Sequence, residues 1–440
     1  MAGNEDVAGA AAPGGFTSPL AAALAPGLLE RFVRYARIDT QAARDRTSCP
    51  STPGQLKLAR MLADELQELG LSDVTVDENG YVTGTLPGNV EGSPTIGLLA
   101  HLDTSPDAPG AGVEPIVHRA YEGGRIELPR GGTVLDPERM PELSRAVGHD
   151  IVTSSGDTLL GADDKAGMAE IVTAMAHMAA HPELARPTLR VGFTPDEEIG
   201  EGATLFDIPR FGARCAYTMD GSSVGELQDE TFSAAEAVVN VQGVDVHPGF
   251  AYGRLVNALS LTARIVAALP ADRLTPETTS GREGFIHVYE LEGNAGAATF
   301  RAIVRDFDDE LLEEHLELLR QVAHEVVAAE PRARMEIAVT RQYPNMRRFL
   351  EDSPEIVAAA AVAIGQEGLE VIREPIRGGT DGSRLSEAGL LTPNLFTGGH
   401  EYHSVREWAS LQEMAAAAAV VVRLAGEWAP RQDAAEGKSG

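Results

Sequence analysis

Metal-binding side chains recur at the ends of apolar segments in this 440-residue chain. Five residues have the chemistry of metal ligands, and they are His101, Asp163, Glu198, Asp220 and His403. Two further acids, Asp103 and Glu197, stand beside members of this set. Carboxylate and imidazole ligands without thiolates are typical of zinc, manganese or cobalt sites. Two such ions about 3.5–4 Å apart, bridged by a carboxylate and a water, form a common hydrolytic centre. The residue types therefore favour a co-catalytic two-metal hydrolase.

Each motif taken alone also has an ordinary structural explanation. In extended chain, Asp103 points to the same side as His101 and can orient its imidazole, but the pair also suits a polar strand end. Asp163 or Asp164 can bridge two metals, or can simply cap the helix that follows. Of the glutamates at 197–198, one can bind a metal while the other activates water, although a solvated acidic loop is an alternative. Spacing does not choose between the two neighbours in either pair.

Short apolar runs predict the elements that position these side chains. The runs at 95–100, 188–194, 215–219 and 394–396 have the pattern of buried strands, and helical patterns lie between some of them. Strands alternating with helices favour an α/β layer fold with a mostly parallel sheet. In such a sheet, ligands bind beyond the carboxyl ends of the strands. Four of the candidate positions each follow a different strand, and the fifth occupies a comparable loop, so we expect them to converge.

The rest of the chain predicts a second domain and several flanking elements. Residues 26–70 have a helical pattern, and the alternating segment after them turns at Asn79-Gly80 as a hairpin. Residues 104–160, rich in Gly and Pro, are expected to form a long connection that shapes the site. From about 224 to 345 the order is β-α-β-β-α-β, which is ferredoxin-like. The expected organisation is a disordered tail at 1–25, a di-metal catalytic domain built from 26–223 and 346–440, and an inserted lid and dimerisation domain at 224–345.

The composition limits the classes of partner. Lys and Arg number 36 against 66 Asp and Glu, and the net charge of −30 argues against a nucleic-acid partner, because phosphate binding needs a basic face. No apolar run approaches the ~18–20 residues of a membrane span, and the acidic first residues do not resemble a signal peptide. The two cysteines, Cys49 and Cys215, cannot form a disulfide framework. We therefore expect a cytoplasmic protein that binds neither membranes nor nucleic acids.

Seven stretches together resemble one family of enzymes. In chain order they are AHLDTSPD, TLLGADDKAG, TPDEEIGEGA, YTMDGSSVGEL, VHPGFAYGRLVNA, PIRGGTDGSRLS and NLFTGGHEYHSVREW. The chain resembles the M20 family of co-catalytic metallopeptidases, and within it the tripeptide aminopeptidases. The resemblance implies an enzyme with two zinc ions per subunit, replaceable by cobalt or manganese, that removes the N-terminal residue from tripeptides. It also implies a homodimer formed through the lid.

The resemblance assigns a role to each candidate ligand. Asp163 would bridge the two zinc ions. His101 and Asp220 would complete one metal site. Glu198 and His403 would complete the other. The choice of Asp163 and Glu198 over their acidic neighbours rests on the resemblance alone.

The resemblance also implies the catalytic acids. Asp103 would support His101 from behind, and Glu197 would be the general base that activates the bridging water and later protonates the leaving amine. The chain departs from the tripeptide aminopeptidases in two places. SVREW replaces a basic spacer after His403, and His400 is an extra histidine.

Four lid and loop residues would bind substrate. By resemblance, His247 would reach a neighbouring subunit's site and polarise the substrate carbonyl. Arg377 would hold a peptide carboxylate, with Gly378 and Gly379 letting the backbone approach closely. A loop histidine and a surface arginine in a turn are the alternatives. Two rival functions remain open, which are another M20 dipeptidase, carboxypeptidase or amidohydrolase, and a catalytically silent relative that only binds peptides.

Overall fold

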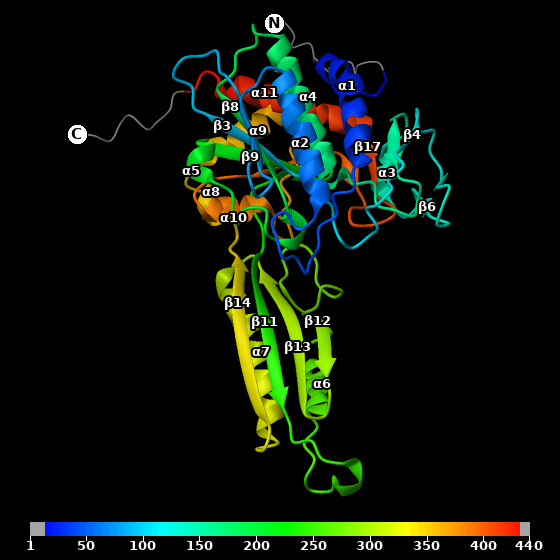
Figure 1. Ribbon diagram of the computed structural model, residues 1–440, viewed down its shortest axis with the longest axis vertical. Helices are drawn as coiled ribbons and strands as arrows, with labels where there is room; N and C mark the ends of the chain where they lie inside the picture. Colours follow the sequence, from blue (N-terminus) through cyan, green and yellow to red (C-terminus); the bar gives the residue numbers. More distant parts are fainter. Residues whose placement is uncertain (1–13, 432–440) are drawn as a thin grey trace, which may run out of the picture. The chain divides into compact units, whose positions relative to one another are not determined.

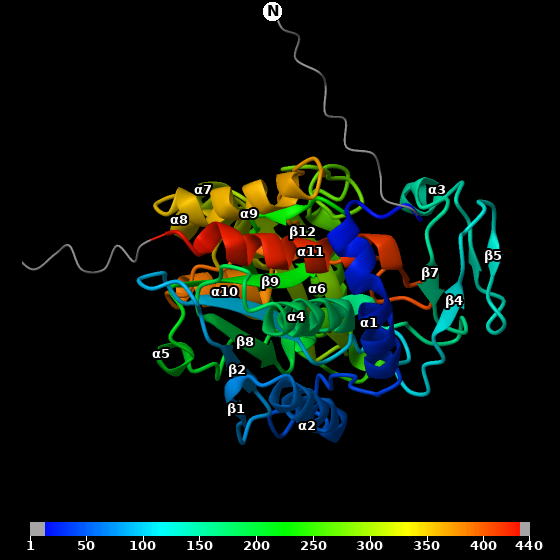
Figure 2. The ribbon, with the colours of Figure 1, turned by 90° about the horizontal axis from the view of Figure 1, so that it is seen from above.

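The computed structural model describes residues 14–431, which form two compact units (Figures 1 and 2). Unit 1 contains the chain up to Asp229, Phe349–Glu374 and the chain from Thr380 onward. Unit 2 contains Glu230–Arg348 and Pro375–Gly379. Unit 2 is therefore built mainly from a segment inserted into the sequence of unit 1. Within the described range, no helix is long and apolar enough to cross a membrane.

Unit 1 is organised around a seven-stranded sheet with the order β1-β2-β8-β3-β9-β15-β10. Its strands are β1 (Ser72–Val76), β2 (Val82–Leu86), β3 (Ile96–His101), β8 (Leu189–Thr194), β9 (Cys215–Gly221), β10 (Leu227–Gln228) and β15 (Asn394–Phe396). The four central strands β8, β3, β9 and β15 are parallel, and the flanking pairs are antiparallel. Every residue of β3 is buried, which explains its continuous apolar run, because both faces of a parallel sheet are covered. The predicted α/β fold with a mostly parallel sheet is confirmed.

Helices surround this sheet, as Figure 2 shows from above. The longer ones are α1 (Pro19–Ala36), α2 (Pro53–Glu68), α4 (Ala162–Ala180), α9 (Pro354–Gln366) and α11 (Leu411–Trp428). The shorter ones are α3 (Pro141–Arg145), α5 (Ile208–Phe211), α8 (Arg347–Leu350), α10 (Asp381–Glu387) and the single 3-10 turn η1 (Glu197–Ile199). Helix α4 packs against β3 and β9 and also against α1 and α11, so its first turn is held over the carboxyl ends of the sheet.

The expected disordered tail at 1–25 is too long. Residues 1–13 lie outside the described range, but α1 already begins at Pro19. Ser18 caps this helix, because its hydroxyl accepts a hydrogen bond from the Ala21 amide at 3.0 Å. Leu24 on the same helix is buried. The buried residues Ala21, Leu24, Ala25 and Leu28 have helical spacing, and the helix packs with them against α4 and α11.

The helical pattern expected over 26–70 is two helices rather than one. Helix α1 ends at Ala36 and α2 begins at Pro53. The segment between them contains Pro50, and proline lacks the amide donor and disfavours helical geometry in the residue before it. The hairpin expected next is present as the antiparallel pair of β1 and β2.

The long connection at 104–160 carries secondary structure of its own. Its elements are β4 (Ile116–His118), β5 (Ile126–Glu127), β6 (Val134–Leu135), α3 and β7 (Ile151–Thr153). Strands β4 and β7 form a small sheet with β16 (Gly399–His400) and β17 (Trp408–Ser410). Figure 2 shows α3, β4, β5 and β7 gathered at one side of unit 1. A separate apolar cluster that includes Tyr121, Leu143 and Trp408 holds this region together.

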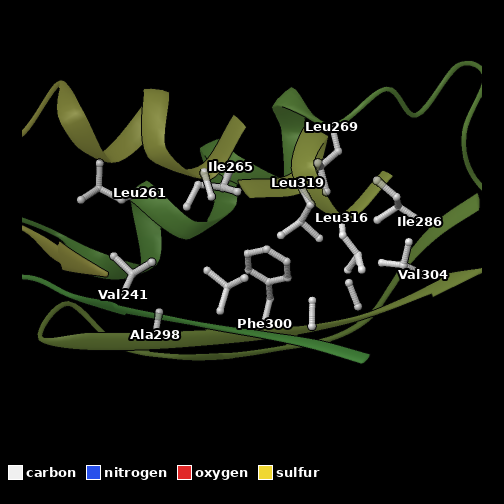
Figure 3. Close-up of a cluster of buried hydrophobic side chains, with 14 of the residues drawn as sticks. Val241, Leu261, Ile265, Leu269, Ile286, Ala298, Phe300, Val304, Leu316 and Leu319 are labelled. Carbon is white, nitrogen blue, oxygen red and sulfur yellow. The ribbon is translucent and has the colours of Figure 1, made fainter. Parts of the chain in front are cut away.

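Unit 2 has one antiparallel sheet covered by two helices. Its strands are β11 (Ser233–Gln242), β12 (Phe285–Gly293), β13 (Ala297–Asp306) and β14 (Arg334–Tyr343), its helices are α6 (Ala258–Ala268) and α7 (Asp309–Ala328), and η2 (Pro248–Phe250) is a short turn. The sheet order is β12-β13-β11-β14, with the β-α-β-β-α-β sequence of elements that the pattern predicts (Figure 1). Figure 3 shows the core between sheet and helices, where Phe300 lies among Val241, Ile265 and Leu319.

Candidate metal centre

The five candidate ligands lie at strand ends, in one loop and at the start of one helix. His101 is the last residue of β3, and Asp220 is the penultimate residue of β9. Glu198 lies in η1, directly after β8. His403 follows β16 in a loop, with a φ of 57°, and Asp163 lies in the first turn of α4. Because β8, β3 and β9 are parallel neighbours, their carboxyl ends meet at one edge of the sheet.

The Asp163 carboxylate contacts both imidazoles. Its Oδ1 lies 2.8 Å from His101 Nε2, and its Oδ2 lies 3.1 Å from His403 Nε2. The His101 Nε2 atom also lies 3.5 Å from Asp220 Oδ1, and the His403 Nε2 atom lies 3.0 Å from Glu198 Oε2. The side chains thus form two triplets that share Asp163. Each triplet offers one imidazole and two carboxylates.

Asp164 also lies near this centre but uses its carboxylate differently. Its Oδ2 accepts the His101 backbone amide at 3.1 Å, and its Oδ1 accepts the Gly167 amide at 3.2 Å. A ligand set of His101, Asp164 and Asp220 has atoms within 4.8 Å of one another, as does the set of His101, Asp163 and Glu198. Geometric proximity alone therefore admits both neighbours. The backbone hydrogen bonds of Asp164 favour Asp163 as the freer carboxylate.

Asp103 connects one imidazole to the glutamate turn. Its carboxylate accepts the amides of Glu197 at 2.9 Å and Glu198 at 3.1 Å, one on each oxygen. His101 Nδ1 lies 3.1 Å from the Asp103 carbonyl oxygen and 3.4 Å from its Oδ1. Asp103 is fully buried. One side chain therefore fixes both the orientation of His101 and the backbone that carries the two glutamates.

Glu407 holds the turn that carries Asp163. Its Oε2 accepts the amides of Leu160 at 2.7 Å and Gly161 at 2.8 Å, and its Oε1 accepts the Asp163 amide at 3.1 Å. Burial raises the pKa of Glu407 to about 7, against the effect of these hydrogen bonds.

Lys165 is a buried cation two residues after Asp163 in α4. Its ammonium group donates to the Ile38 carbonyl at 2.7 Å, and burial lowers the pKa of Lys165 to about 8.

The centre contains more buried acid than its two imidazoles neutralise. Burial is the main cause that raises the pKa of Glu197 well above its usual range, that of Glu198 to about 8 and that of Asp381 to about 6. Asp163 differs, since burial raises its pKa but hydrogen bonds from both histidines outweigh this and lower it. Burial lowers the pKa of His403, but its contacts with Asp163 and Glu198 raise it to about 11. Such a cluster is the environment that a divalent cation neutralises.

One buried atom of the cluster has no partner. Glu198 Oε1 receives no hydrogen bond within the described residues, although it is shielded from solvent. An unpaired carboxylate oxygen in such a place costs free energy unless another group binds it. The donor set is also of the oxygen and nitrogen type that zinc, cobalt or manganese accept. The residues present therefore fit two divalent ions.

Sequence reasoning missed a second support for the glutamate turn. Asp196 has a φ of 60°, is fully buried and immediately precedes Glu197. Its carboxylate accepts the Ser51 amide at 2.7 Å, the Ser51 hydroxyl at 2.5 Å and the Gln55 side-chain amide at 2.8 Å. The signal in the sequence was an acid directly before the glutamate pair, but its partners lie more than 140 residues away.

The candidate substrate-binding residues belong to unit 2. His247 is exposed at the start of η2, and its Nδ1 accepts the Gly249 amide at 3.1 Å. Arg377 donates to the carbonyls of Gly281 and Glu283 at 2.9 and 2.7 Å, and its guanidinium lies 5.2 Å from the ring centre of Phe232.

The two glycines after Arg377 differ in their surroundings. A Cβ atom on Gly379 would come within 2.3 Å of the Tyr343 ring, so only glycine fits there. Gly378 has ordinary room, with 3.7 Å to Ile376. Their roles in substrate binding stay predictions.

Comparison with known proteins identifies the family. The model of peptidase family M20/M25/M40 matches residues 159–427, and the chain belongs to this family. It is 46% identical over 399 residues to peptidase T of Vibrio parahaemolyticus, covering 90% of this chain and 97% of that protein. The resemblance predicted from the seven stretches is therefore confirmed, and the chain is a hydrolase of peptide bonds.

Solved structures share the fold. The aminopeptidase PepT of Bacillus cereus matches with a TM-score of 0.71 at 22% identity, covering 92% of this chain and 99% of that one. A tripeptidase of Staphylococcus aureus matches with a TM-score of 0.74 at 20% identity, over the same shares of the two chains. The α/β architecture is thus shared along nearly the whole chain.

Proposed function

We propose that the protein is an aminopeptidase that removes the N-terminal residue from tripeptides. The observation that carries this proposal is the pair of ligand triplets joined by Asp163, with Glu197 next to Glu198 in the same turn and within electrostatic reach of Asp220 and His101. The similarity to peptidase T supports the substrate class. The rival dipeptidase, carboxypeptidase and amidohydrolase activities use the same centre, so only substrate tests separate them.

Two zinc ions, replaceable by cobalt or manganese, are the proposed cofactors. His101 and Asp220 would hold one ion, Glu198 and His403 the other, and Asp163 would bridge them. When bound, the ions supply Lewis acidity, which acidifies a shared water and stabilises negative charge on the substrate carbonyl oxygen. The unpartnered Glu198 Oε1 and the excess of buried acid support this assignment.

Glu197 is the proposed general base. The Glu197 backbone amide donates a hydrogen bond to Asp103, and this contact fixes the backbone from which the Glu197 side chain extends. The Glu197 carboxylate would accept a proton from the attacking water and then deliver this proton to the nitrogen of the departing peptide. Burial raises the pKa of the Glu197 carboxyl, which makes it a stronger base than an exposed glutamate. Asp103 acts through its neighbours and is a positioning residue.

Unit 2 is the proposed lid and dimerisation domain, corresponding to the domain expected at 224–345. Strands β12 and β14 lie at the two edges of its sheet. On β12, Tyr289 and Leu291 are 44% and 45% exposed. An edge strand with exposed apolar side chains suits extension of the sheet across a two-fold axis. We propose that His247 and the 377–379 segment bind substrate, with His247 serving the partner subunit's site. Both cysteines are free thiols, which supports a cytoplasmic location.

Substrate length and end-group requirements test the proposal. Zinc-loaded protein would be offered Leu-Gly, Leu-Gly-Gly and Leu-Gly-Gly-Gly, together with N-acetyl-Leu-Gly-Gly. We expect release of free leucine from the unblocked tripeptide only. Cleavage of the acetylated tripeptide at its C-terminal bond would favour a carboxypeptidase, and removal of the acetyl group would favour an amidohydrolase. No hydrolysis of any peptide, with two metal equivalents bound, would overturn the proposal.

A further inference from the structure

Unit 1 contains a cavity that is lined by none of the proposed metal ligands. Its volume is about 390 Å³, and its lining includes Arg145, His149, His400 and Glu413 together with Leu369 and Ile372. None of these residues belongs to the two ligand triplets. Cavities of about 300–1,000 Å³ with apolar walls and a few polar groups are typical of small-molecule sites. This volume is large enough for an amino acid or a dipeptide.

The extra histidine of the sequence forms the polar end of this cavity. His400 Nε2 lies 2.8 Å from Glu413 Oε2, and both residues are buried, with exposures of 4% and 9%. The imidazole is stacked on the Trp408 ring at 4.2 Å, which fixes its plane. The pair leaves the other Glu413 carboxylate oxygen without a hydrogen-bond donor among residues 14–431. A buried carboxylate with a spare acceptor is suited to an ammonium group.

Other residues that line the cavity suit the carboxylate and the side chain of an amino acid. The Arg145 guanidinium is 70% exposed and pairs with Glu142 at 3.0 Å through one nitrogen, so other donors of its planar group remain for a carboxylate. The side chains of Val224, Leu369 and Ile372 supply an apolar wall. One cavity therefore offers an anionic group, a cationic group and an apolar surface.

Two of the segments that line the cavity lie close in sequence to metal ligands. Ser223, which lines it, is three residues after Asp220, and His400 is three residues before His403. The two segments are joined directly, because the Ser222 hydroxyl donates to the Gly399 carbonyl at 2.7 Å. The Tyr402 hydroxyl also donates to the Gly221 carbonyl at 3.0 Å. A ligand in the cavity would therefore contact one segment close to each ligand triplet.

We propose that this cavity binds a small zwitterion with an apolar side chain, an α-amino acid or dipeptide, and that its occupancy changes turnover at the metal centre. The ammonium group contacts Glu413, the carboxylate contacts Arg145, and the side chain lies against Leu369 and Ile372. The regulatory part rests on the proposed function, because amino acids and dipeptides are the products of tripeptide hydrolysis. The binding part does not depend on it.

Calorimetric titration of zinc-loaded full-length protein with L-leucine tests the binding part. We expect N-acetyl-L-leucine, which lacks the ammonium group, and L-leucinamide, which lacks the carboxylate, to bind at least about tenfold more weakly. Glu413→Gln and Arg145→Ala should each weaken leucine binding by a similar factor, whereas Arg139→Ala, an exposed arginine outside the cavity, should not. If Glu413→Gln does not fold, Arg145→Ala and Leu369→Trp, which fills the cavity, decide the question. Unchanged leucine affinity in these variants would overturn the proposal.

Kinetics test the regulatory part. Leucine bound in the cavity should change kcat at saturating tripeptide, and leucine that competes with tripeptide for the metal centre should raise KM only. We expect leucine to change the kcat of the parent at least about twofold and to have no such effect in Leu369→Trp, with each rate normalised to the same variant without leucine. An unchanged parent kcat at full occupancy would overturn the regulatory part. Absence of tripeptide hydrolysis would instead refute the proposed function and leave the calorimetric result intact.

Discussion

The metal centre of unit 1 and the His247 loop of unit 2 are built in opposite ways. At the metal centre, Asp103 and Glu407 are buried and use their oxygens to hold backbone amides of the ligand-bearing turns. In the loop, Phe250 and Tyr252 are 69% and 101% exposed. Buried side chains that accept several hydrogen bonds fix the positions of functional residues. Exposed apolar side chains are typical of surfaces that bind another molecule. The difference indicates that unit 1 fixes the geometry of the candidate metal centre by its own hydrogen bonds, whereas we propose that the loop becomes ordered on binding a substrate or a second subunit.

The largest effect is expected at the bridging carboxylate. Asp163→Ala removes the carboxylate that contacts both imidazoles. We expect loss of both zinc ions, measured as metal equivalents per chain after dialysis, and loss of detectable hydrolysis. Asp157→Ala, at an exposed acid before the same turn, is the matched control and should retain two equivalents. Two equivalents in Asp163→Ala would contradict the bridging role.

Replacing the proposed base should separate binding from turnover. Glu197→Gln keeps the shape of the side chain, so we expect two zinc equivalents and a kcat lower by about 10²- to 10⁴-fold. Glu201→Gln serves as control, because this nearby glutamate pairs with Arg46 at 2.9 Å and lies outside both triplets. A kcat near the parent value would assign the base to another residue.

The loop histidine should matter for activity and little for stability. If His247 polarises the substrate carbonyl, His247→Ala should lower kcat by about 10²- to 10³-fold. Its exposure limits the change in the free energy of unfolding to about 0.5 kcal/mol. His324→Ala, an exposed histidine on α7, should change neither quantity. A normal kcat for His247→Ala would remove the loop from the reaction and leave it as an interaction surface only.

The support behind the glutamate turn should have an intermediate effect. Asp196→Asn weakens the hydrogen bonds to Ser51 and Gln55 and is expected to lower kcat by about 10- to 100-fold. Because the role is positional, the substitution should lower kcat more than it raises KM. Asp64→Asn, at an exposed acid of α2, provides the reference. An equal effect of both substitutions would mean that the turn carrying Glu197 and Glu198 does not need the Asp196 hydrogen bonds to keep its conformation.

The smallest effect is a pH dependence of stability at Lys165. Burial lowers its folded-state pKa to about 8, below its usual 10.5 in an unfolded chain. Between these values the unfolded state binds more protons, so the free energy of unfolding should rise as pH increases from 8 to 10.5. Between pH 8 and pH 10.5 the free energy of unfolding of the parent should rise by at most about 3 kcal/mol more than that of Lys165→Met. Urea denaturation at both pH values measures this difference. Lys57→Met, at an exposed lysine, should reproduce the parent's dependence on pH.

Local sequence patterns predict the strands of the sheet better than the side chains that hold the ligand-bearing turns. The runs that form β3, β8, β9 and β15 are mostly apolar because most of their residues are buried, so the sequence predicts the α/β class directly. The predicted tail is too long because α1 extends past Pro26 to Pro19, although a proline inside a helix removes a backbone donor. Partners such as Ser51 and Asp196 meet only after the chain has folded, and no local pattern encodes a hydrogen bond across 145 positions.

The shared position of Asp163 has a consequence for the order in which the protein is made. His101, Asp163 and Asp220 all precede Glu230, where unit 2 begins, so the residues of the first triplet are synthesised before any of the inserted segment. The second triplet waits for His403, and the Asp163 turn waits for Glu407, until unit 2 has been synthesised. A nascent chain would therefore carry the residues of one triplet, without Glu407 to hold the Asp163 turn, while unit 2 is translated. Domains fold as units during synthesis, so unit 2 has time to form its own core before His403 is synthesised.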